Sequence, residues 1–295
     1  MITYGNLVHQ FDLLRKYLKF DQSFIIAGWV PYYHDYCLIC GILNVLYGNG
    51  TFYMMSPFDF LANPGSWFDV VTKYRATHIA GPNFGFELIM NKSTPERRKN
   101  WDLSSLRLVQ NSSEPVRVNL WKRFTDTFSS ECKLDPTVLQ SAFGLAEHTV
   151  GVTVEGKTIL YIERESLEAG KLRVAKNEGK HFRMWFILIF FKDPKYTISM
   201  VSCGYNFDGE VDVRIVNPKT LVQCEDLVVG EIWANSPSKA IGMHYKKILR
   251  NLFCLGYYGL VKESKETFEA EIANGVSNAR YLRTGDLGFM YKGEL

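Results

Sequence analysis

The feature that most constrains this chain is an alternation of short apolar runs with amphipathic, helix-like segments over its first 150 residues. Alternation of this kind is typical of a parallel sheet with flanking helices, because each strand must be followed by a crossover that returns the chain to the same edge. The pattern predicts strands at residues 24–30, 51–55, 77–80, 106–110 and 137–142, and helices at residues 5–19, 36–47, 66–74, 84–90 and 116–128.

Polar motifs follow each of the predicted strands. They are His34-Asp35, Ser56-Pro57, Gly81-Pro82-Asn83, Ser112-Ser113-Glu114, and the stretch from Phe143 to Glu147. Ligands of parallel α/β sheets bind at the carboxyl ends of the strands. The sequence therefore predicts one site to which all five motifs contribute.

The stretch from Phe143 to Glu147 contains a compact set of parts for a nucleotide. Phe143 offers a flat face for a base, Gly144 lets the backbone turn close to a ligand, and Glu147 offers oxygen ligands suited to Mg²⁺ beside phosphates. His148 would add positive charge there if it were protonated. Taken alone, these residues are more often a strand-to-helix turn with a surface glutamate, so the assignment depends on the rest of the chain.

Composition excludes several classes of protein. The net charge of +3 does not indicate a partner among nucleic acids, and the longest apolar run, residues 182–191, is shorter than the roughly 20 residues that cross a bilayer. The N-terminus shows no secretory signal pattern. Cys37 and Cys40 form the one close cysteine pair, which fits a buried helix face better than a redox pair or a zinc site. A reducing, cytoplasmic setting is expected.

The pattern of hydrophobic residues changes after residue 150. Residues 211–216 alternate with a period of two, and residues 230–234 follow as a second strand-like run. This pattern predicts a smaller, antiparallel, barrel-like subdomain. We therefore expect an α/β subdomain over residues 1–150, a connecting segment over 151–204 and a β-rich subdomain over 205–295.

Two motifs in order, Phe143–Glu147 and Arg283-Thr284-Gly285-Asp286, resemble the adenine and ribose motifs of the adenylate-forming superfamily of acyl and aryl ligases. Within it the chain is most similar to the fatty acyl-AMP ligases. The segments that carry this second resemblance are residues 29–35, 55–57, 60–61, 74–77, 81–84, 103–105 and 111–116, and residues 167–170 and 201–204 resemble the flanks of that family's extra segment.

The resemblance implies ATP-dependent activation of a fatty acid to an acyl-adenylate, followed by transfer to the thiol of an acyl carrier protein or a polyketide synthase carrier domain. Mg²⁺ would accompany ATP. The implied roles are Mg²⁺ binding for Glu147, a place near the fatty acid carboxylate for His34, nucleotide binding for Ser112, Ser113, Glu114, Pro115, Phe143, Gly144, Leu145 and Asp286, and acyl binding for Pro82, Asn83 and Phe84.

Departures from the family pattern leave two alternatives open. The phosphate loop expected before Met1 and the lysine-bearing small domain expected after Leu295 are absent from this sequence, so we expect residues 1–295 alone to form little adenylate. Residues 180–196 and 243–255 interrupt the resemblance and have the character of mistranslated intervening sequence. The alternatives are a fatty acyl-CoA ligase, and a non-catalytic domain that binds nucleotide or lipid or acts as a scaffold.

Overall fold

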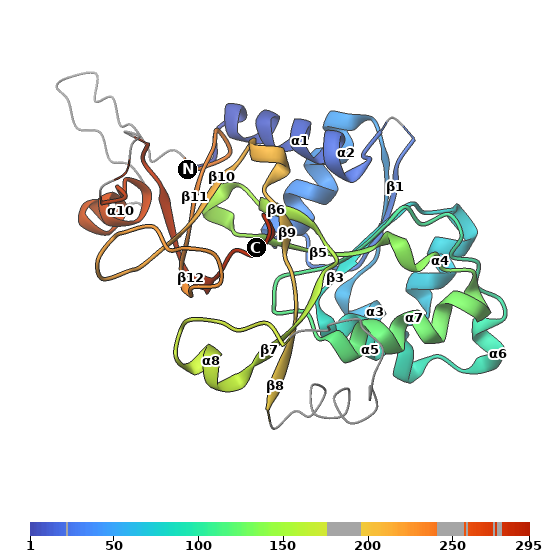
Figure 1. Ribbon diagram of the computed structural model, residues 1–295. Helices are drawn as coiled ribbons and strands as arrows, with labels where there is room; N and C mark the ends of the chain where they lie inside the picture. The colour runs from blue at the N-terminus through green and yellow to red at the C-terminus, as the bar shows by residue number, and fades with distance from the viewer. Residues whose placement is uncertain (22, 176–195, 241–256, 258, 274, 276–278) are drawn as a thin grey trace, which may run out of the picture. The chain divides into compact units, whose positions relative to one another are not determined.

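The expected alternation of strands and helices is present in the computed structural model, which describes all residues except 22, 176–195, 241–256, 258, 274 and 276–278 (Figure 1). The chain forms two units. The first unit comprises Ile2–Glu155 and Pro237–Ala240, and the second comprises Met1, Gly156–Ser236 and Ile241–Leu295. The two interrupting stretches, residues 180–196 and 243–255, lie outside the described residues except for Tyr196.

The first unit is built on a sheet whose strands lie in the order β2-β1-β3-β4-β5-β6. Strands β2, β1, β3, β4 and β5 run parallel, with Ile26 opposite both Phe52 and His78. The predicted parallel sheet is therefore confirmed. The strands are β1 (Ile25–Gly28), β2 (Thr51–Met54), β3 (His78–Gly81), β4 (Leu108–Asn111), β5 (Leu139–Gly144) and β6 (Gly151–Gly156).

Helices cover both faces of this sheet, with α1 and α2 on one side and α4, α5 and α7 on the other (Figure 1). Local sequence fixes several of their ends. The Thr3 side chain accepts a hydrogen bond from the Asn6 amide and completes a capping box at the start of α1. The helices are α1 (Tyr4–Leu18), α2 (Asn44–Gly48), α3 (Pro57–Ala62), α4 (Ser66–Tyr74), α5 (Asn83–Lys92), α6 (Pro95–Arg98) and α7 (Val118–Cys132), with 3₁₀ helices η2 (Pro136–Val138) and η3 (Ala146–His148).

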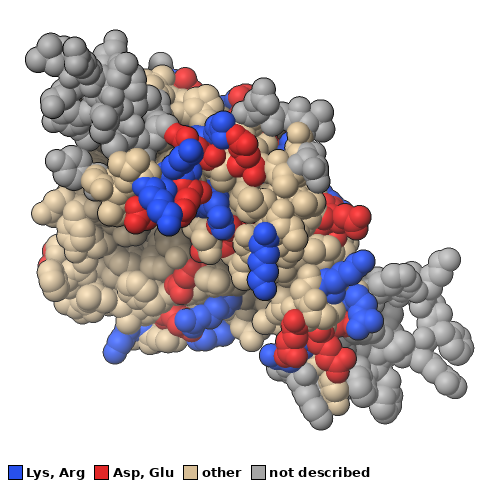
Figure 2. Space-filling view, turned by 90° about the vertical axis from the view of Figure 1, so that its left-hand side faces the viewer, with Lys and Arg blue, Asp and Glu red and all other residues tan. Residues whose placement is uncertain are grey.

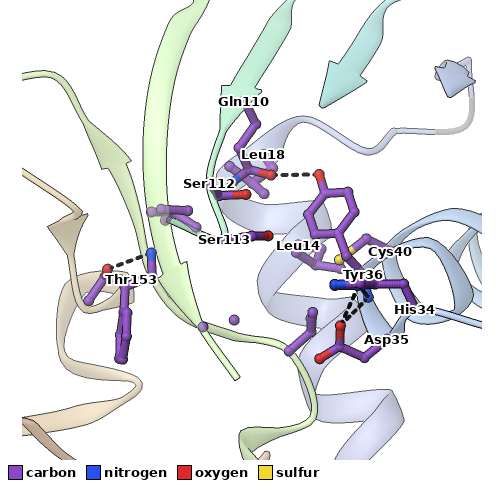
Figure 3. A pocket seen from close by; sticks show the side chains of 16 residues that line it. Leu14, Leu18, His34, Asp35, Tyr36, Cys40, Gln110, Ser112, Ser113 and Thr153 are labelled. Carbon is purple, nitrogen blue, oxygen red and sulfur yellow. Dashed lines mark hydrogen bonds and ion pairs between the residues drawn. The ribbon is translucent and has the colours of Figure 1, made fainter. Parts of the chain in front are cut away.

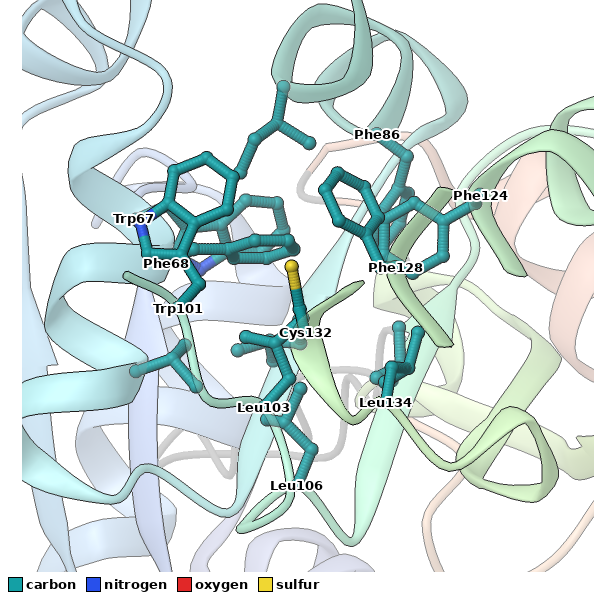
Figure 4. Packing of buried hydrophobic residues seen from close by; sticks show 14 of the residues in the cluster. Trp67, Phe68, Phe86, Trp101, Leu103, Leu106, Phe124, Phe128, Cys132 and Leu134 are labelled. Atoms are coloured by element: carbon teal, nitrogen blue, oxygen red, sulfur yellow. The ribbon is translucent and has the colours of Figure 1, made fainter. Parts of the chain in front are cut away.

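The main core lies where α4, α5 and α7 pack against the sheet (Figure 4). Aromatic side chains dominate it, including Trp67, Phe68, Phe124 and Phe128, all of which are at most 2% exposed. Their rings meet mainly edge to face, as in the Phe68–Phe128 pair at 5.1 Å and 76°. This packing holds α4, α5 and α7 against the sheet.

The helix expected at residues 36–47 begins as a π-helix, η1 (Tyr36–Leu43), and continues as α2. Cys37 and Cys40 are buried in it as free thiols. Burial raises the pKa of Cys37 to about 11 and raises that of Cys40 further. Thiols of this kind are poor nucleophiles and poor metal ligands, which agrees with a packing role. Single-turn π-helical insertions are rare and often lie at functional sites.

The second unit contains the smaller antiparallel sheets that the alternating pattern predicts. Strands β10 (Asp212–Val216), β11 (Gly230–Asn235) and β12 (Leu282–Gly288) form one sheet in that order, and β7 (Ile159–Glu163) pairs with β8 (Thr197–Val201) in another. The first of these is linear rather than closed among the described strands. The remaining elements are β9 (Gly204–Tyr205), α8 (Arg164–Glu168), η4 (Phe207–Gly209) and α10 (Val261–Phe268).

Surface features agree with the composition. On the face shown in Figure 2, acidic and basic side chains are interleaved with uncharged surface. Among the described residues, no helix is long and apolar enough to cross a membrane.

Candidate active site

Three of the five predicted strand-end motifs meet at a cavity of about 260 Å³ in the first unit, which we call the nucleotide cavity after the ligand that the sequence predicts (Figure 3). His34 and Asp35 reach it from the segment after β1, Ser112 and Ser113 from the segment after β4, and Phe143 from the end of β5. Convergence at the carboxyl ends of parallel strands is what the order of the motifs predicts.

The turn after β5 requires glycine at position 144. A Cβ atom on Gly144 would lie 1.8 Å from the carbonyl oxygen of Val150, which no side chain can occupy. The tight approach brings the 3₁₀ helix η3 back toward β6, and the Phe143 amide donates a hydrogen bond to Thr153 Oγ1 at 3.3 Å. The backbone of Phe143, which lines the nucleotide cavity, is therefore fixed by this turn and by β6.

The loop after β4 is held by Asn83. Its side-chain amide donates to the Pro115 carbonyl at 2.9 Å, while its carbonyl oxygen accepts from Asn111 Nδ2 at 3.0 Å and from the Arg117 amide at 3.3 Å. The Glu114 carboxylate in turn accepts from the Asn83 amide at 2.8 Å. These bonds fix the segment that carries Ser112 and Ser113, with Ser113 in the left-handed region at φ 72°.

A second cavity, the acyl cavity, has a volume of about 350 Å³ and a mainly apolar lining. Apolar side chains that line it come from three segments of the first unit, and they are Trp29, Val30, Pro31, Pro57, Leu61, Pro82 and Phe84. The same four residues line both cavities, namely His34, Tyr36, Ser112 and Ser113. We call these four residues the junction.

Two junction contacts were not foreseen from the sequence. The Tyr36 hydroxyl donates to Gln110 Oε1 at 2.7 Å, and the Tyr36 amide hydrogen-bonds to Asp35 Oδ1 and His34 Nδ1 (Figure 3). Burial raises the pKa of Tyr36, so its hydroxyl stays a donor. The sequence indicates Gln110 only as part of a predicted strand. Because Gln110 lies two residues before Ser112 in an extended segment, the two side chains are expected on the same face of the sheet, and this spacing could have identified Gln110 as a site residue.

Several of the expected site residues lie elsewhere. Asn83 supports the loop after β4 and does not line the acyl cavity that Pro82 and Phe84 line. Glu114, Pro115 and Leu145 are likewise outside the lining of the nucleotide cavity. Glu114 and Pro115 instead make the contacts to Asn83 described above.

His148 does not carry the positive charge that its position had suggested. The ring is buried, and Nδ1 lies 2.9 Å from the Gly151 carbonyl oxygen. Burial, more than any other cause, lowers the pKa of His148 to about 4. The imidazole is therefore neutral at pH 7 and part of the fold of the turn.

Glu147 lies on η3, three residues after Gly144, and is half-buried. Its backbone carbonyl accepts a hydrogen bond from the Ala240 amide at 2.8 Å, which fixes the position of this short helix. Within the described residues there is no group of three or more His, Cys, Asp or Glu side chains that could hold a metal ion. A single carboxylate nevertheless fits Mg²⁺, which proteins often bind through one or two carboxylates together with substrate phosphates.

The motif from Arg283 to Asp286 belongs to the second unit, on β12. Glu231 of β11 binds it on one side, because its carboxylate accepts from Arg283 Nη2 at 2.7 Å, Arg283 Nε at 3.0 Å and the Gly285 amide at 3.1 Å. The Thr284 hydroxyl donates to the Ile232 carbonyl at 2.8 Å. Asp286 is left exposed at the tip of the motif.

The sequence pattern of the family described as AMP-binding enzyme matches residues 1–244. The chain belongs to the AMP-binding enzyme family. Over 299 aligned positions it is 35% identical to a medium-chain-fatty-acid–[acyl-carrier-protein] ligase, JamA, of Moorena producens (strain JHB), an alignment that covers 100% of this chain and 45% of that protein. It is 31% identical to the long-chain-fatty-acid–AMP ligase FadD26 of Mycobacterium marinum, with 94% of this chain and 43% of that protein covered.

Solved structures show the same relationship. This AMP-binding family member superimposes with a TM-score of 0.83 and 30% identity on a fatty acyl-adenylate ligase from L. pneumophila in complex with acyl adenylate and pyrophosphate. The match covers 100% of this chain and 46% of that one. The chain thus spans slightly less than half the length of the relatives it matches. The expected resemblance to fatty acyl-AMP ligases is confirmed.

Proposed function

We propose that this chain is the acyl- and adenine-binding part of a fatty acyl-AMP ligase, which activates a fatty acid with ATP and passes the acyl group to a carrier-protein thiol. The observation that carries the proposal is the junction. A cavity of mixed polar and apolar lining that suits a nucleotide and a mainly apolar cavity that suits an acyl chain share His34, Tyr36, Ser112 and Ser113. An acyl-adenylate has this same division, with a nucleotide and an alkyl chain joined at one mixed anhydride.

In the first step a carboxylate oxygen of the fatty acid attacks the α-phosphorus of ATP. The bond from that phosphorus to the bridging oxygen breaks, and pyrophosphate leaves with its electron pair. In the second step the carrier thiol attacks the acyl carbonyl, AMP leaves, and the thiol proton passes to solvent. Negative charge builds at the α-phosphate, so N–H and O–H donors at the junction are the groups that lower the barrier.

The proposed roles are supported by the cavity-lining positions of residues in the first unit and, for Asp286, by the resemblance of its motif to the ribose motif alone. The Phe143 ring stacks on adenine, the backbone of Ser112 and Ser113 lines its edge, and the turn at Gly144 closes the site. His34, at the junction, lies beside the fatty acid carboxylate. The resemblance of its motif assigns Asp286 to the ribose hydroxyls. Asn83 acts indirectly, because it holds the loop that carries the two junction serines.

Mg²⁺ is the metal that we propose for the Glu147 carboxylate. When bound with ATP it would neutralise charge on the phosphates. Glu147 would supply one oxygen ligand and the phosphates would supply others, since the described residues offer no further acidic cluster. The backbone bond from Ala240 keeps the short helix that carries this carboxylate in place.

Binding of AMP to Phe143→Ala tests the nucleotide half of the proposal. Loss of one base–aromatic stack costs about 1–3 kcal/mol, so the dissociation constant for AMP should rise about 5- to 150-fold in a calorimetric titration. Phe58→Ala is the matched control, because Phe58 is 81% exposed and lines neither cavity. Equal AMP affinity in both variants would overturn the assignment of this cavity.

The acceptor is tested by supplying preformed acyl-adenylate together with either a phosphopantetheinylated carrier domain or coenzyme A. The proposal expects thioester on the carrier domain. Its support is the chain's similarity to JamA, whose name gives an acyl carrier protein as the acceptor. Thioester formed with coenzyme A alone would favour an acyl-CoA ligase instead.

A further inference from the structure

The acyl cavity has a buried end and an exposed rim. Trp29, which lines it, is 3% exposed, whereas Leu61 and Phe84 are 53% and 47% exposed. The junction provides the polar end at which a carboxylate would lie. An alkyl chain that starts there can run inward to Trp29 or outward between Leu61 and Phe84. Different lining residues would limit the length of the chain on each path.

The Trp29 indole is held firmly at the buried end. It stacks on Phe60 with ring centroids 4.0 Å apart and planes at 5°, and it meets Trp67 at right angles at 5.9 Å. Gly85 leaves room for it, because a Cβ atom there would lie 2.4 Å from Trp29 Cζ2. The ring therefore cannot swing aside to admit a longer chain without displacing Phe60 or the backbone of α5.

The Phe84 ring connects the buried end with the rim. It lies 5.3 Å from the Trp29 ring at 67°, so one side of the rim packs directly against the indole. A chain directed inward would be enclosed by Trp29, Phe84 and Pro82, and would exchange water for apolar contacts along its length. A chain directed outward would leave part of its length in water. Burial of each methylene group contributes about 0.8 kcal/mol, which favours the inward path.

We propose that Trp29 sets the length of the acyl chain that this site accepts, by closing the buried end of the acyl cavity. The inference rests on the proposed function and adds to it a specificity-determining residue. The terminal methyl group of the preferred fatty acid meets the indole, and a longer acid has no room for its last carbons. The acyl cavity, at about 350 Å³, lies at the small end of the usual range for ligand pockets, about 300–1,000 Å³.

The test measures how binding depends on fatty acid length in Trp29→Phe and Trp29→Leu. A series of saturated fatty acids of increasing length is titrated against the purified chain, with competition against one fluorescent fatty acid as the readout. Phenylalanine keeps an aromatic ring on Phe60 and frees part of the space of the indole, and leucine frees more. For acids longer than the preferred one, affinity should rise about fourfold per newly buried methylene, with the larger shift in Trp29→Leu.

Trp101→Phe is the matched control. Trp101 is also 3% exposed and lies in the same aromatic core, but it lines neither cavity. Its loss should lower stability without changing the preferred length, so a general loosening of the core is distinguished from a change at the cavity end. Leu61→Trp at the exposed rim supplies a variant that does not disturb the core, and the inward path predicts an unchanged length profile for it.

The outcomes separate the inference from the proposed function. The proposal is supported if the preferred fatty acid becomes longer in the Trp29 variants and keeps its length in Trp101→Phe and Leu61→Trp. An unchanged profile in Trp29→Phe, or a shorter preferred acid in Leu61→Trp, overturns it and assigns the chain to the outward path, while the proposed function stands. No binding of any fatty acid by the unchanged chain, with AMP still bound, overturns the acyl assignment and this inference together.

Discussion

Glu231 is the residue whose replacement most sharply tests how the Arg283–Asp286 motif is built. Its carboxylate is 6% exposed and takes three N–H donors, two from Arg283 and one from Gly285. Glu231→Gln keeps the shape but replaces one oxygen with an NH₂ group. The remaining oxygen cannot serve both Arg283 and the Gly285 amide, and the new NH₂ group faces another donor.

The expected cost follows from the burial of the two partners. Hydrogen bonds to charged groups contribute about 1.5–3 kcal/mol each, and breaking a fully buried pair costs about 3–5 kcal/mol. Arg283 is 32% exposed, so water can hydrate part of its guanidinium group when the carboxylate is lost, and this reduces the cost. We therefore expect Glu231→Gln to lower the free energy of unfolding of the second unit by about 2–3 kcal/mol.

Urea unfolding followed by tryptophan fluorescence measures this loss, because Trp233 lies 5.6 Å beneath the Arg283 guanidinium. Asp212→Asn is the matched control in the same sheet. Asp212 pairs with Arg214 at 2.6 Å, where the two side chains are 34% and 42% exposed, and an asparagine oxygen can still accept the bond that the Tyr281 hydroxyl donates at 2.6 Å, so we expect the change to cost less than about 1 kcal/mol. Equal costs for the two variants would refute the reasoning.

The same variant has a functional readout. Glu231 acts on the proposed ribose contact through the Arg283–Asp286 motif, and so it is a positioning residue. Glu231→Gln should reduce the preference of the chain for AMP over 2′,3′-dideoxy-AMP, because Asp286 is no longer held for both hydroxyls. If the variant loses stability but keeps the full preference, Glu231 has a structural role only.

Three further predictions concern the first unit. Gly144→Ala should lower the free energy of unfolding by about 3 kcal/mol and abolish AMP binding, because the new Cβ would overlap the Val150 carbonyl. Its control, Gly5→Ala in α1, should raise the free energy of unfolding by about 0.5–1 kcal/mol. Urea unfolding measures both changes. The neutral state of His148 stabilises the fold above pH 6.5, and about 3 kcal/mol should be lost as pH falls from 6.5 to 4; an equally steep loss in His148→Asn would contradict this. Thr3→Ala removes the cap of α1 and should lower the melting temperature by an amount equivalent to about 1 kcal/mol, with no change in AMP affinity.

The sequence was sufficient for the parallel sheet and for the main helices, because the hydrophobic period separates strands from helices when segments are long. It could not foresee that η1 is a π-helix. The apolar pattern over residues 36–47 shows which residues are buried, but it does not distinguish a π-helical hydrogen-bond register from an α-helical one. The short helices α3 and α8 were also missed, since five or six residues carry too little periodicity to detect.

The lining of the cavities was predictable where a residue lies at or just after the end of a strand, as His34, Ser112 and Phe143 do. It was not predictable where a side chain turns away from its neighbours. Asn83 lies between two residues that line the acyl cavity, yet its own side chain is directed to the Pro115 carbonyl. Glu231 gave no sequence signal for its role, because its partner is 52 residues away along the chain.

The central claim is that one ligand occupies both cavities through the junction, and the binding of a hydrolysis-resistant acyl-adenylate tests it most directly. The compound is titrated against the chain beside AMP and the matching fatty acid. The account predicts that it binds more tightly than either AMP or the fatty acid. One joined molecule loses translational and rotational entropy once on binding, whereas two separate ligands lose it twice. It also predicts that a fatty acid and AMP each compete with it. Affinity no greater than that of AMP alone, with no competition by the fatty acid, would contradict the claim.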